Sequence, residues 1–379
     1  MITSDGGVYR SADVAMTDGN ARTRTWAIVV CAGLVLLSGC AAQSGGEDLA
    51  GDVPEGVDVV LTADADVIED ETTRSVANTL LEESVPQGSD EPRSVEAVLD
   101  EIEAEADTNV SVDDLEGVAL FGRTPEGADV GEIEAEGYTG VVLAGDWERE
   151  AFLSDVRSAS DRVRRGESYA GVDVYESVNE TTAEVTYLAT YEEGRWVVST
   201  DRRVVEDVID VAQGSTDAFG GDLRTAYDRT REDAFVRYAV VLSERQRRLV
   251  GAAAERAGEG APVDLSQFAS VTAYAGAYYT EGDDVGVATY LTAEDEDAAE
   301  RLNRTLGSLI RLGQSTVEPD SPQARQIDAL GTERDGRSVG IVYEIDAEAL
   351  EELIRDQVDE PTGAPIRLRP QTVTVTVTT

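Results

Sequence analysis

Acidic side chains outnumber basic ones so strongly in this chain that they restrict the solution conditions in which it can fold. The 379 residues include 77 Asp and Glu against 31 basic side chains, and every basic residue is Arg, so the net charge is −46. Such a charge, with few aromatic residues, is typical of disordered chains. However, hydrophobic residues make up 41% of the chain and recur with the periods of strands and helices, which a disordered acidic tract lacks. We therefore expect a folded body.

The high negative charge is compatible with folding at high salt. At molar salt the Debye length falls to about 3 Å, so that repulsion between carboxylates is largely screened. This composition resembles that of proteins from halophilic archaea, which implies a salt-rich habitat.

No basic stripe offsets the acidic residues, and we therefore expect no binding to nucleic acids or to anionic lipid surfaces.

The N-terminus carries the most specific motif. An apolar run of 12 residues, Trp26 to Leu37, follows Arg22 and Arg24. The run is too short to span a bilayer and suits the core of a signal peptide. It ends in Leu37-Ser38-Gly39-Cys40. This ending resembles a lipobox, the alternative being a buried helix that contains a cysteine.

The lipobox resemblance implies a lipid on Cys40, which becomes the new N-terminus. Residues 1–39 are then a signal peptide, and Met16 would give it an ordinary length. The residues before the apolar run include no two adjacent arginines, so twin-arginine export is not indicated. We expect a protein on the extracellular face of the cell membrane, attached through Cys40 and a lipidated tether over residues 40–56. Cys31 lies in the removed segment, which excludes disulfides and Cys-ligated metals in the mature chain.

The mature chain is expected to have an α+β fold made of two related halves, 57–232 and 233–358. Similar segments, Val112-Asp113-Asp114-Leu115 and Val263-Asp264-Leu265, precede a strand, strand, helix, loop, strand series in each half, although any α+β chain shows such runs. Hairpin-connected strands favour antiparallel sheets, each covered by helices. The spacing predicts a helix with Phe152, Val156 and Val163 on its inner face. Thr292 and Asp295 are expected to form a helix capping box.

Residues 359–379 form a separate C-terminal segment. Val and Thr alternate over its last eight residues, which is the pattern of a half-buried strand. We expect either an edge strand or a Thr-rich tail there.

Residue types exclude most catalytic chemistry. Without His, Lys or a free thiol, the common Ser-His, Cys-His and Ser-Lys nucleophile systems and His-rich metal sites cannot be built. Neither a phosphate-binding Gly loop nor a dinucleotide fingerprint occurs, so no cofactor is expected. Paired carboxylates could hydrolyse glycosides, but among 77 acidic residues any pair can be picked out, and a solvated face is the default interpretation.

Two weak ligand candidates remain. Asp64 and Asp66 point to one strand face and could hold a cation, although the calcium-loop pattern fails at Ile68. Tyr274, Tyr278 and Tyr290, with Tyr279 in the same hairpin, could form a ligand platform. Ordinary sheet residues are the simpler interpretation of these side chains.

Three Asn-x-Ser/Thr sequons are candidate glycosylation sites: Asn109, Asn179 and Asn303. Asn179 lies in an expected turn and is the preferred acceptor, whereas Asn303 lies in an expected helix.

Three functions stay open at this point. The first is a non-enzymatic envelope lipoprotein that binds a ligand or partner, and at the level of architecture this resembles lipoproteins that ferry or hold lipids. The second is a purely structural or interaction protein of the cell surface. The third is a carboxylate-based hydrolase.

Overall fold

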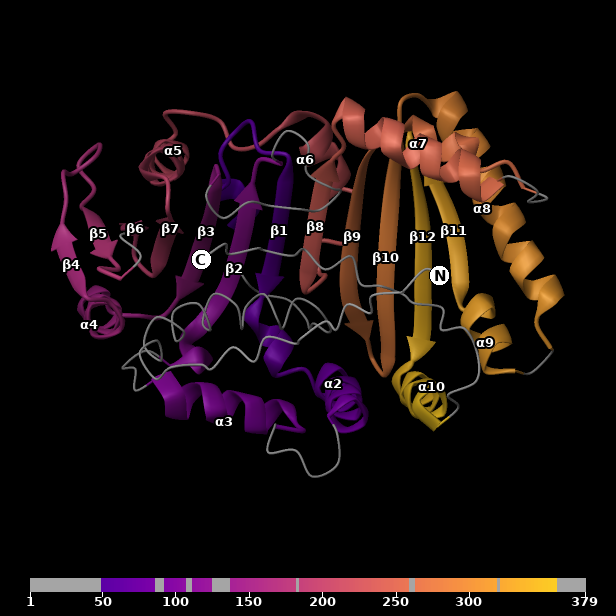
Figure 1. The fold of residues 1–379 in the computed structure, drawn as a ribbon, viewed down its shortest axis with the longest axis horizontal. Helices are drawn as coiled ribbons and strands as arrows, with labels where there is room; N and C mark the ends of the chain where they lie inside the picture. The colour runs from indigo at the N-terminus through magenta and orange to yellow at the C-terminus, as the bar shows by residue number, and fades with distance from the viewer. Residues whose placement is uncertain are drawn as a thin grey trace, which may run out of the picture.

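The computed structural model has one twelve-stranded sheet in which all neighbouring strands pair antiparallel. It describes residues 49–85, 92–106, 111–124, 137–181, 184–258, 263–318 and 321–359. The strand order is β11-β12-β10-β9-β8-β1-β2-β3-β7-β6-β5-β4, which Figure 1 shows from right to left. The strands are β1 (Val59–Asp64), β2 (Leu115–Gly122), β3 (Thr139–Gly145), β4 (Arg162–Arg165), β5 (Val174–Val178), β6 (Val185–Glu192), β7 (Arg195–Ser199), β8 (Val236–Val241), β9 (Val271–Glu281), β10 (Asp284–Ala293), β11 (Leu330–Asp335) and β12 (Ser338–Asp346).

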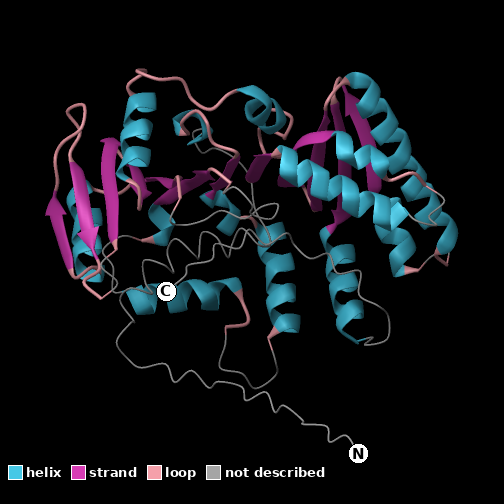
Figure 2. Ribbon diagram, turned by 45° about the horizontal axis from the view of Figure 1, so that its top comes forward, coloured by secondary structure: helices cyan, strands magenta, loops and turns pink. Residues whose placement is uncertain are grey.

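Helices lie on both faces and at both ends of the strands (Figures 1 and 2). They are η1 (Leu49–Asp52), η2 (Ala65–Ile68), α2 (Glu71–Ser84), α3 (Val95–Ala106), η3 (Val112–Asp114), α4 (Arg149–Ala159), α5 (Arg202–Ala212), α6 (Gly221–Tyr227), α7 (Glu244–Gly258), η4 (Ser266–Ser270), α8 (Glu296–Thr316), α9 (Pro322–Asp328) and α10 (Ala347–Asp359). None of these helices is long and apolar enough to cross a bilayer.

The first face of the sheet carries the largest core. Strand residues such as Val60, Val142 and Ala239 pack there against η1, α5 and α6. Helix α5 is strongly amphipathic, and its Val204, Val205, Val208 and Ile209 are fully buried. Burying four such side chains stabilises the fold by roughly 6–12 kcal/mol before the loss of chain entropy is counted.

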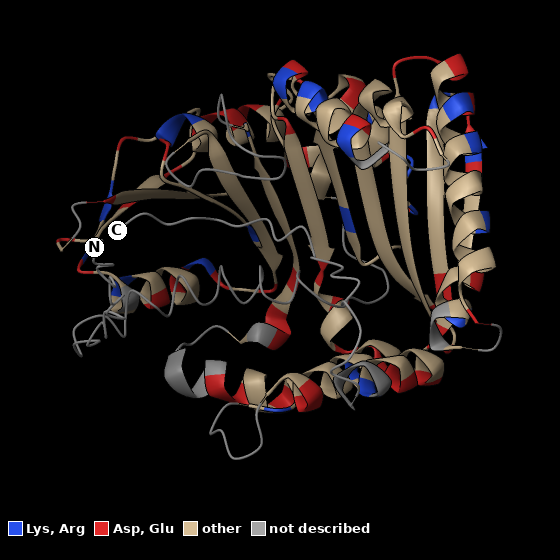
Figure 3. Cartoon of the chain, turned by 45° about the vertical axis from the view of Figure 1, so that its right-hand side comes forward, with Lys and Arg blue, Asp and Glu red and all other residues tan. Residues whose placement is uncertain are grey.

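The second face is covered in parts. Helix α4 packs over β7 and β6, where Phe152 stacks on Trp196 with ring centroids 4.1 Å apart. Helix α8 covers the other end through Ala298, Leu302 and Leu306. Helices α2 and α10 pack on Val285 at the lower end of β10. Apart from the edge strands β4 and β11, the strands are largely free of charged residues, which gather on the helices and at strand ends (Figure 3).

One expectation about the sheets is wrong. The fold is α+β and antiparallel, but the described strands form one sheet and not a separate sheet for each half. The two segments join where β1 pairs with β8, with Leu61 opposite Tyr238. Apolar periodicity shows which residues face the core, but not which strands become neighbours.

Several element boundaries also differ from expectation. Val163 lies in edge strand β4 and not on the inner face of the preceding helix, because α4 ends at Ala159. Asp295 is itself the N-cap of α8 and accepts a hydrogen bond from Ala298 N, while Thr292 lies buried in β10. The predicted capping box is therefore wrong. A capping box does occur at α7, where Ser243 and Gln246 exchange side-chain-to-backbone hydrogen bonds.

Four aromatic rings lie over glycines that are their direct cross-strand partners. A Cβ added to each glycine would meet the ring at 2.2 to 3.1 Å. The pairs are Tyr238–Gly276, Tyr279–Gly286, Tyr290–Gly340 and Phe121–Gly140. A glycine normally weakens a strand, and here the neighbouring ring fills the space that its missing side chain leaves.

Replacing Gly140, the glycine under the Phe121 ring, should destabilise the folded protein. At Gly140 a Cβ would lie 2.4 Å from the Phe121 ring and 2.6 Å from Val204. Both neighbours are fully buried, so neither can move freely. We expect Gly140→Ala to lower the free energy of unfolding by about 3 kcal/mol, the upper range for overpacking. Denaturant unfolding in molar salt measures this change.

The matched control is Gly331→Ala on exposed strand β11. There the nearest atom to an added Cβ is Val342 O at 3.8 Å. This change should alter stability by less than about 0.5 kcal/mol. Equal effects of the two substitutions would show that the Phe121–Gly140 contact is not tight.

Candidate functional site

The described residues begin inside the expected tether. Cys40, the expected signal peptide, Asn109 and residues 360–379 lie outside them. The end of the 40–56 tether is placed differently from expectation, because Leu49, Ala50 and Val53 are buried in the core of the first face. At most residues 40–48 can therefore act as a tether. Composition alone suggested a flexible segment because its Gly and acidic residues mask three apolar ones.

A buried polar network fixes this N-terminal segment to the sheet. Asp52 accepts hydrogen bonds from Tyr191 Oη at 2.7 Å and from Arg195 Nη1 at 2.6 Å. Burial, reinforced by the Asp52 charge, raises the pKa of Tyr191 far above its ordinary value, so the phenol stays a proton donor. The network ties η1 to β6 and β7.

The predicted tyrosine platform does not form. Tyr274 and Tyr278 lie on the second face of β9 with Val236 and Tyr238, as their cross-strand pairing shows. Tyr290 lies on the first face beside Ala288, together with Tyr279. The tyrosines are therefore split between opposite faces. Their number in one hairpin drew attention, but the two-residue period of a strand separates them.

The expectation that Asp64 and Asp66 share a strand face is wrong, because β1 ends at Asp64 and Asp66 lies in the following helix η2. Asp64 Oδ1 accepts a hydrogen bond from Asp66 N at 3.0 Å, which caps η2. Burial and the nearby Asp64 and Glu69 charges raise the pKa of Asp66. Among the described residues, no group of three or more His, Cys, Asp or Glu side chains could hold a metal ion.

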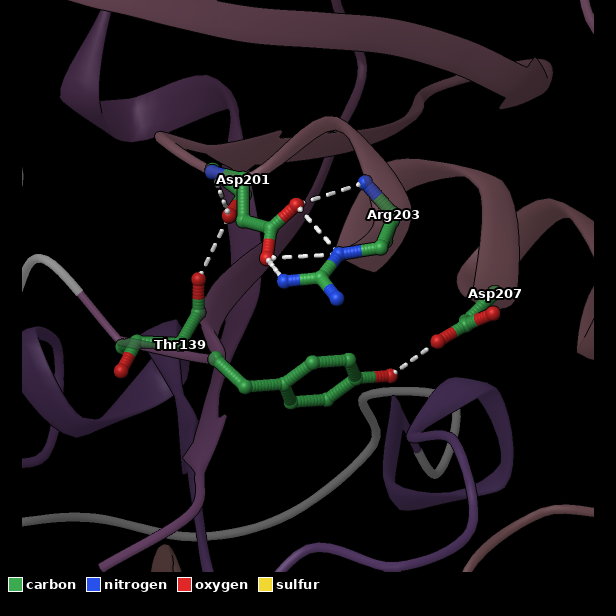
Figure 4. Close-up of polar contacts among 6 residues, drawn as sticks. Thr139, Asp201, Arg203 and Asp207 are labelled. Atoms are coloured by element: carbon green, nitrogen blue, oxygen red, sulfur yellow. Dashed lines mark hydrogen bonds and ion pairs between the residues drawn. The ribbon is translucent and has the colours of Figure 1, made fainter. Parts of the chain in front are cut away.

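A second polar network joins the rim of β3 to the start of α5 (Figure 4). Ser199 Oγ donates to Thr139 O at 2.6 Å, and Asp201 N donates to Ser199 Oγ at 3.0 Å. Asp201 caps α5 through Arg203 N and binds the Arg203 guanidinium, with Nη2 2.6 Å from Oδ2. The hydrogen bond from Arg203 lowers the pKa of Asp201.

Tyr138 completes this network from β3's side. Its phenol donates to Asp207 Oδ2 at 2.5 Å, and the Arg123 guanidinium lies 3.8 Å from its ring centroid. Burial, followed by the hydrogen bond to Asp207, raises the pKa of Tyr138. Asp201 and Asp207 are thus both engaged with donors from their own chain. The arrangement supports a clamp that holds α5 on the sheet and offers no general acid–base pair.

The sequons differ in their surroundings. Asn179 follows β5, and its Oδ1 accepts from Thr181 N at 2.9 Å, in a turn whose next two residues are exposed. Asn303 lies inside α8, and its Oδ1 is buried without a hydrogen-bond partner. A transferase must reach the side-chain amide, which favours the turn.

We expect glycosylation at Asn179 in the native host. Asn179→Gln should lower the mass of the purified protein by one glycan, whereas the control Asn303→Gln should leave it unchanged apart from the substitution. Intact-mass spectrometry checks both variants. An Asn179→Gln protein with no glycan-sized loss would exclude this site.

An apolar strip runs along the middle of the second face. The residues of this strip form one cluster, and all of them lie on strands. Val59 and Leu61 of β1, Leu120 of β2 and Val240 of β8 form its centre. Partly buried side chains surround them: Val141, Val236, Tyr238 and Tyr274. Burial raises the pKa of Tyr238 and Tyr274, so both phenols stay neutral. The strip therefore carries no charge within a strongly acidic molecule.

The same face continues to an exposed apolar residue. Val287 of β10 lies opposite Tyr278 on β9 and Tyr343 on β12. It is 42% exposed, which is unusual for a valine inside a central strand. Val59, Leu61, Leu120 and Val240 are themselves buried, at 3–8% exposure, so Val287 is the exposed end of this uncharged strip.

Comparisons with known proteins add little. No protein-family model matches the chain, and no curated protein matches it. Three solved structures are similar, crystal forms I, IV and III of TP0453, with 13%, 14% and 12% identity. They cover 82–83% of this chain and 97–100% of their own, with TM-scores of 0.39, 0.40 and 0.38. Scores this low do not establish a shared function.

Proposed function

We propose that this protein is a non-enzymatic lipoprotein, anchored through Cys40 to the extracellular face of the membrane of a salt-adapted organism, and that it binds a ligand or partner on the second face of its sheet. The lipobox order around Cys40 and the net charge of −46 support the anchor and the habitat. The short tether, at most residues 40–48, would hold the body close to the membrane.

The uncharged strip is the observation that carries the binding role. The centre of the strip, with Val59, Leu61, Leu120 and Val240, is buried, and Val287 is the exposed member at which a ligand or partner would first meet it. In this molecule the contrast is sharp, because carboxylates are plentiful and yet the strip from Val59 to Val287 contains none. The polar networks around Asp52 and Asp201 are engaged within the chain, which supports a binding role over catalysis.

We also infer that the two halves are related by duplication. The strand order β1-β2-β3-β7-β6 in the first half corresponds to β8-β9-β10-β12-β11 in the second. A 3-10 helix precedes β2 and another precedes β9, at η3 and η4. The first half differs by two added strands, β4 and β5.

A charge placed on the strip should abolish binding. The test is native mass spectrometry of the protein purified from its host in volatile salt. We expect the wild type to retain a bound molecule and Val287→Glu to lose it, because an apolar ligand that covered the new carboxylate would strip it of its hydration without compensation.

Leu249→Glu provides the matched control. Leu249 lies on α7 and is 45% exposed, close to the 42% of Val287. This variant should retain the molecule. Retention of the same molecule by Val287→Glu would rule out the strip as its site. If the wild type retains nothing and pull-down from host membranes finds no partner that depends on Val287, the binding role fails.

A further inference from the structure

The two edge strands of the sheet carry opposite charges. Among the described residues the sheet ends at β4 on one side and at β11 on the other. Strand β4 has the sequence Arg-Val-Arg-Arg, with three guanidinium groups in four residues of a chain dominated by carboxylates. Strand β11 has Glu333 and Asp335 with one arginine, Arg334. Edge strands leave backbone N–H and C=O groups unpaired, so each can accept another strand.

Two charged residues of each edge, Arg162 and Arg164 on β4 and Glu333 and Asp335 on β11, lie on the first face of the sheet. Arg164 pairs with Glu176, which lies opposite Tyr187 of the first-face core. Arg162 lies two residues away and points to the same side. At the other edge, Glu333 lies opposite Gly340, whose own partner Tyr290 is in that core. Asp335 has the same orientation as Glu333.

Strand direction allows these edges to meet. The sheet has twelve strands and every neighbouring pair is antiparallel, so its first and last strands run in opposite directions. A second copy displaced sideways in the plane of the sheet would therefore bring its β11 antiparallel to β4 of the first copy. The same face of both sheets would point to the same side.

We infer that β4 of one molecule pairs with β11 of the next, giving a head-to-tail array of this chain. With Arg162 opposite the neighbour's Asp335 and Arg164 opposite its Glu333, two arginines meet two carboxylates. In this register Val163 lies opposite Arg334, and Arg165 lies opposite Thr332. No like charges then face each other directly. Because the contact joins two different surfaces, it does not close on itself as a two-fold dimer does.

Contacts within each chain leave these groups accessible. The Arg164 side chain bonds to Glu176 and is 61% exposed. The Asp335 side chain bonds to Arg229 and is 74% exposed. Charges on edge strands often prevent pairing. Edges that repel copies of the same chain would carry the same sign, whereas β4 and β11 carry opposite signs.

Salt should control this association. Two molecules with a charge of −46 repel strongly at low ionic strength, and molar salt shortens the range of that repulsion to about 3 Å. Backbone hydrogen bonds and directly contacting ion pairs act within that range. Assembly is therefore expected in molar potassium chloride and should weaken as salt falls.

The experiment is sedimentation velocity of the mature protein in mild detergent and molar potassium chloride, over a series of protein concentrations. The wild type should form species that grow with concentration. The double variant Arg162→Glu, Arg164→Glu has two acidic edges and should stay monomeric. The double variant Glu333→Arg, Asp335→Arg has two basic edges and should also stay monomeric. An equal mixture of the two should assemble again, because each then meets an edge of opposite charge.

Arg301→Glu, Arg304→Glu on the exposed side of α8 is the matched control and should assemble like the wild type. Circular dichroism confirms that each variant is folded, and recovery in the mixture shows that the edges themselves are intact. A wild type that stays monomeric at every concentration, edge variants that assemble like the wild type, or a mixture that stays monomeric would each overturn the inference.

Discussion

Lowering the salt around the mature protein from molar to low millimolar should unfold it. Removing residues 1–39 takes away three Arg and three Asp, so the mature charge is still −46. Two unit charges about 6 Å apart repel by about 0.7 kcal/mol in water before screening. Many such pairs together rival a typical net stability of about 5–15 kcal/mol. Screening favours the folded state because its charges lie closer together than those of the expanded chain.

Circular dichroism across a potassium chloride series measures this effect, as a loss of helix and sheet signal when salt falls. Acidification provides a second arm of the test. Near pH 5 carboxylates begin to take up protons, which lowers the net charge, and some structure should return at low salt. A protein that keeps the same signal at low and molar salt would contradict the salt-adaptation interpretation.

The recovery of structure on acidification at low salt should be limited to a range of pH. Hydrogen bonds from arginine side chains lower the pKa of Asp201 and Asp233 in the folded protein. A group with a lowered pKa stabilises the fold while it is ionised and loses this contribution as pH falls through its folded-state pKa. Since these pKa values lie below the ordinary value, the loss comes well below pH 5. Structure at low salt should therefore return near pH 5 and disappear again at lower pH.

Sequence patterns located the elements that bury apolar side chains. Helix α5, with Val204, Val205, Val208 and Ile209, and the hairpin β9–β10 follow their apolar periods closely. Apolar periodicity did not predict the two edge strands. Strand β11 has the sequence Leu-Gly-Thr-Glu-Arg-Asp and is almost wholly exposed, and β4 is three-quarters arginine. Both are held by backbone hydrogen bonds to one neighbour, which leave no pattern in the side chains.

Long-range pairing explains the other differences. The Tyr274–Tyr290 group looks like one cluster in the sequence, yet the pleat of the strands divides it between two faces. Leu49, Ala50 and Val53 look like part of a polar tether, and their burial depends on η1 packing against β1, β2, β3 and α5. The uncharged strip combines residues from six strands, β1, β2, β3, β8, β9 and β10, that no single segment reveals. Its outlying member Val287 becomes notable only through its exposure.

If Cys40 carries the anchoring lipid, Cys40→Ser should remove the mature protein from the membrane. In this variant the proposed lipid attachment position has no thiol, so the mature, membrane-bound form should disappear. The protein would then be found as uncleaved precursor or in the medium. Cell fractionation followed by immunoblotting measures the distribution.

Cys31→Ser is the matched control for this variant. Cys31 lies within the apolar run that signal-peptide removal discards, and its substitution should leave the membrane-bound form unchanged. Equal membrane binding by Cys40→Ser and the wild type would show that attachment does not depend on the lipid.

The most direct test of a lipid-anchored surface protein is the mass of its mature N-terminus. Mass spectrometry of the protein extracted from host membranes should show a chain that begins at Cys40 and carries the added mass of a lipid. An unmodified Cys40, or a mature protein that still contains Trp26 to Leu37, would contradict the anchor and the localisation that depends on it.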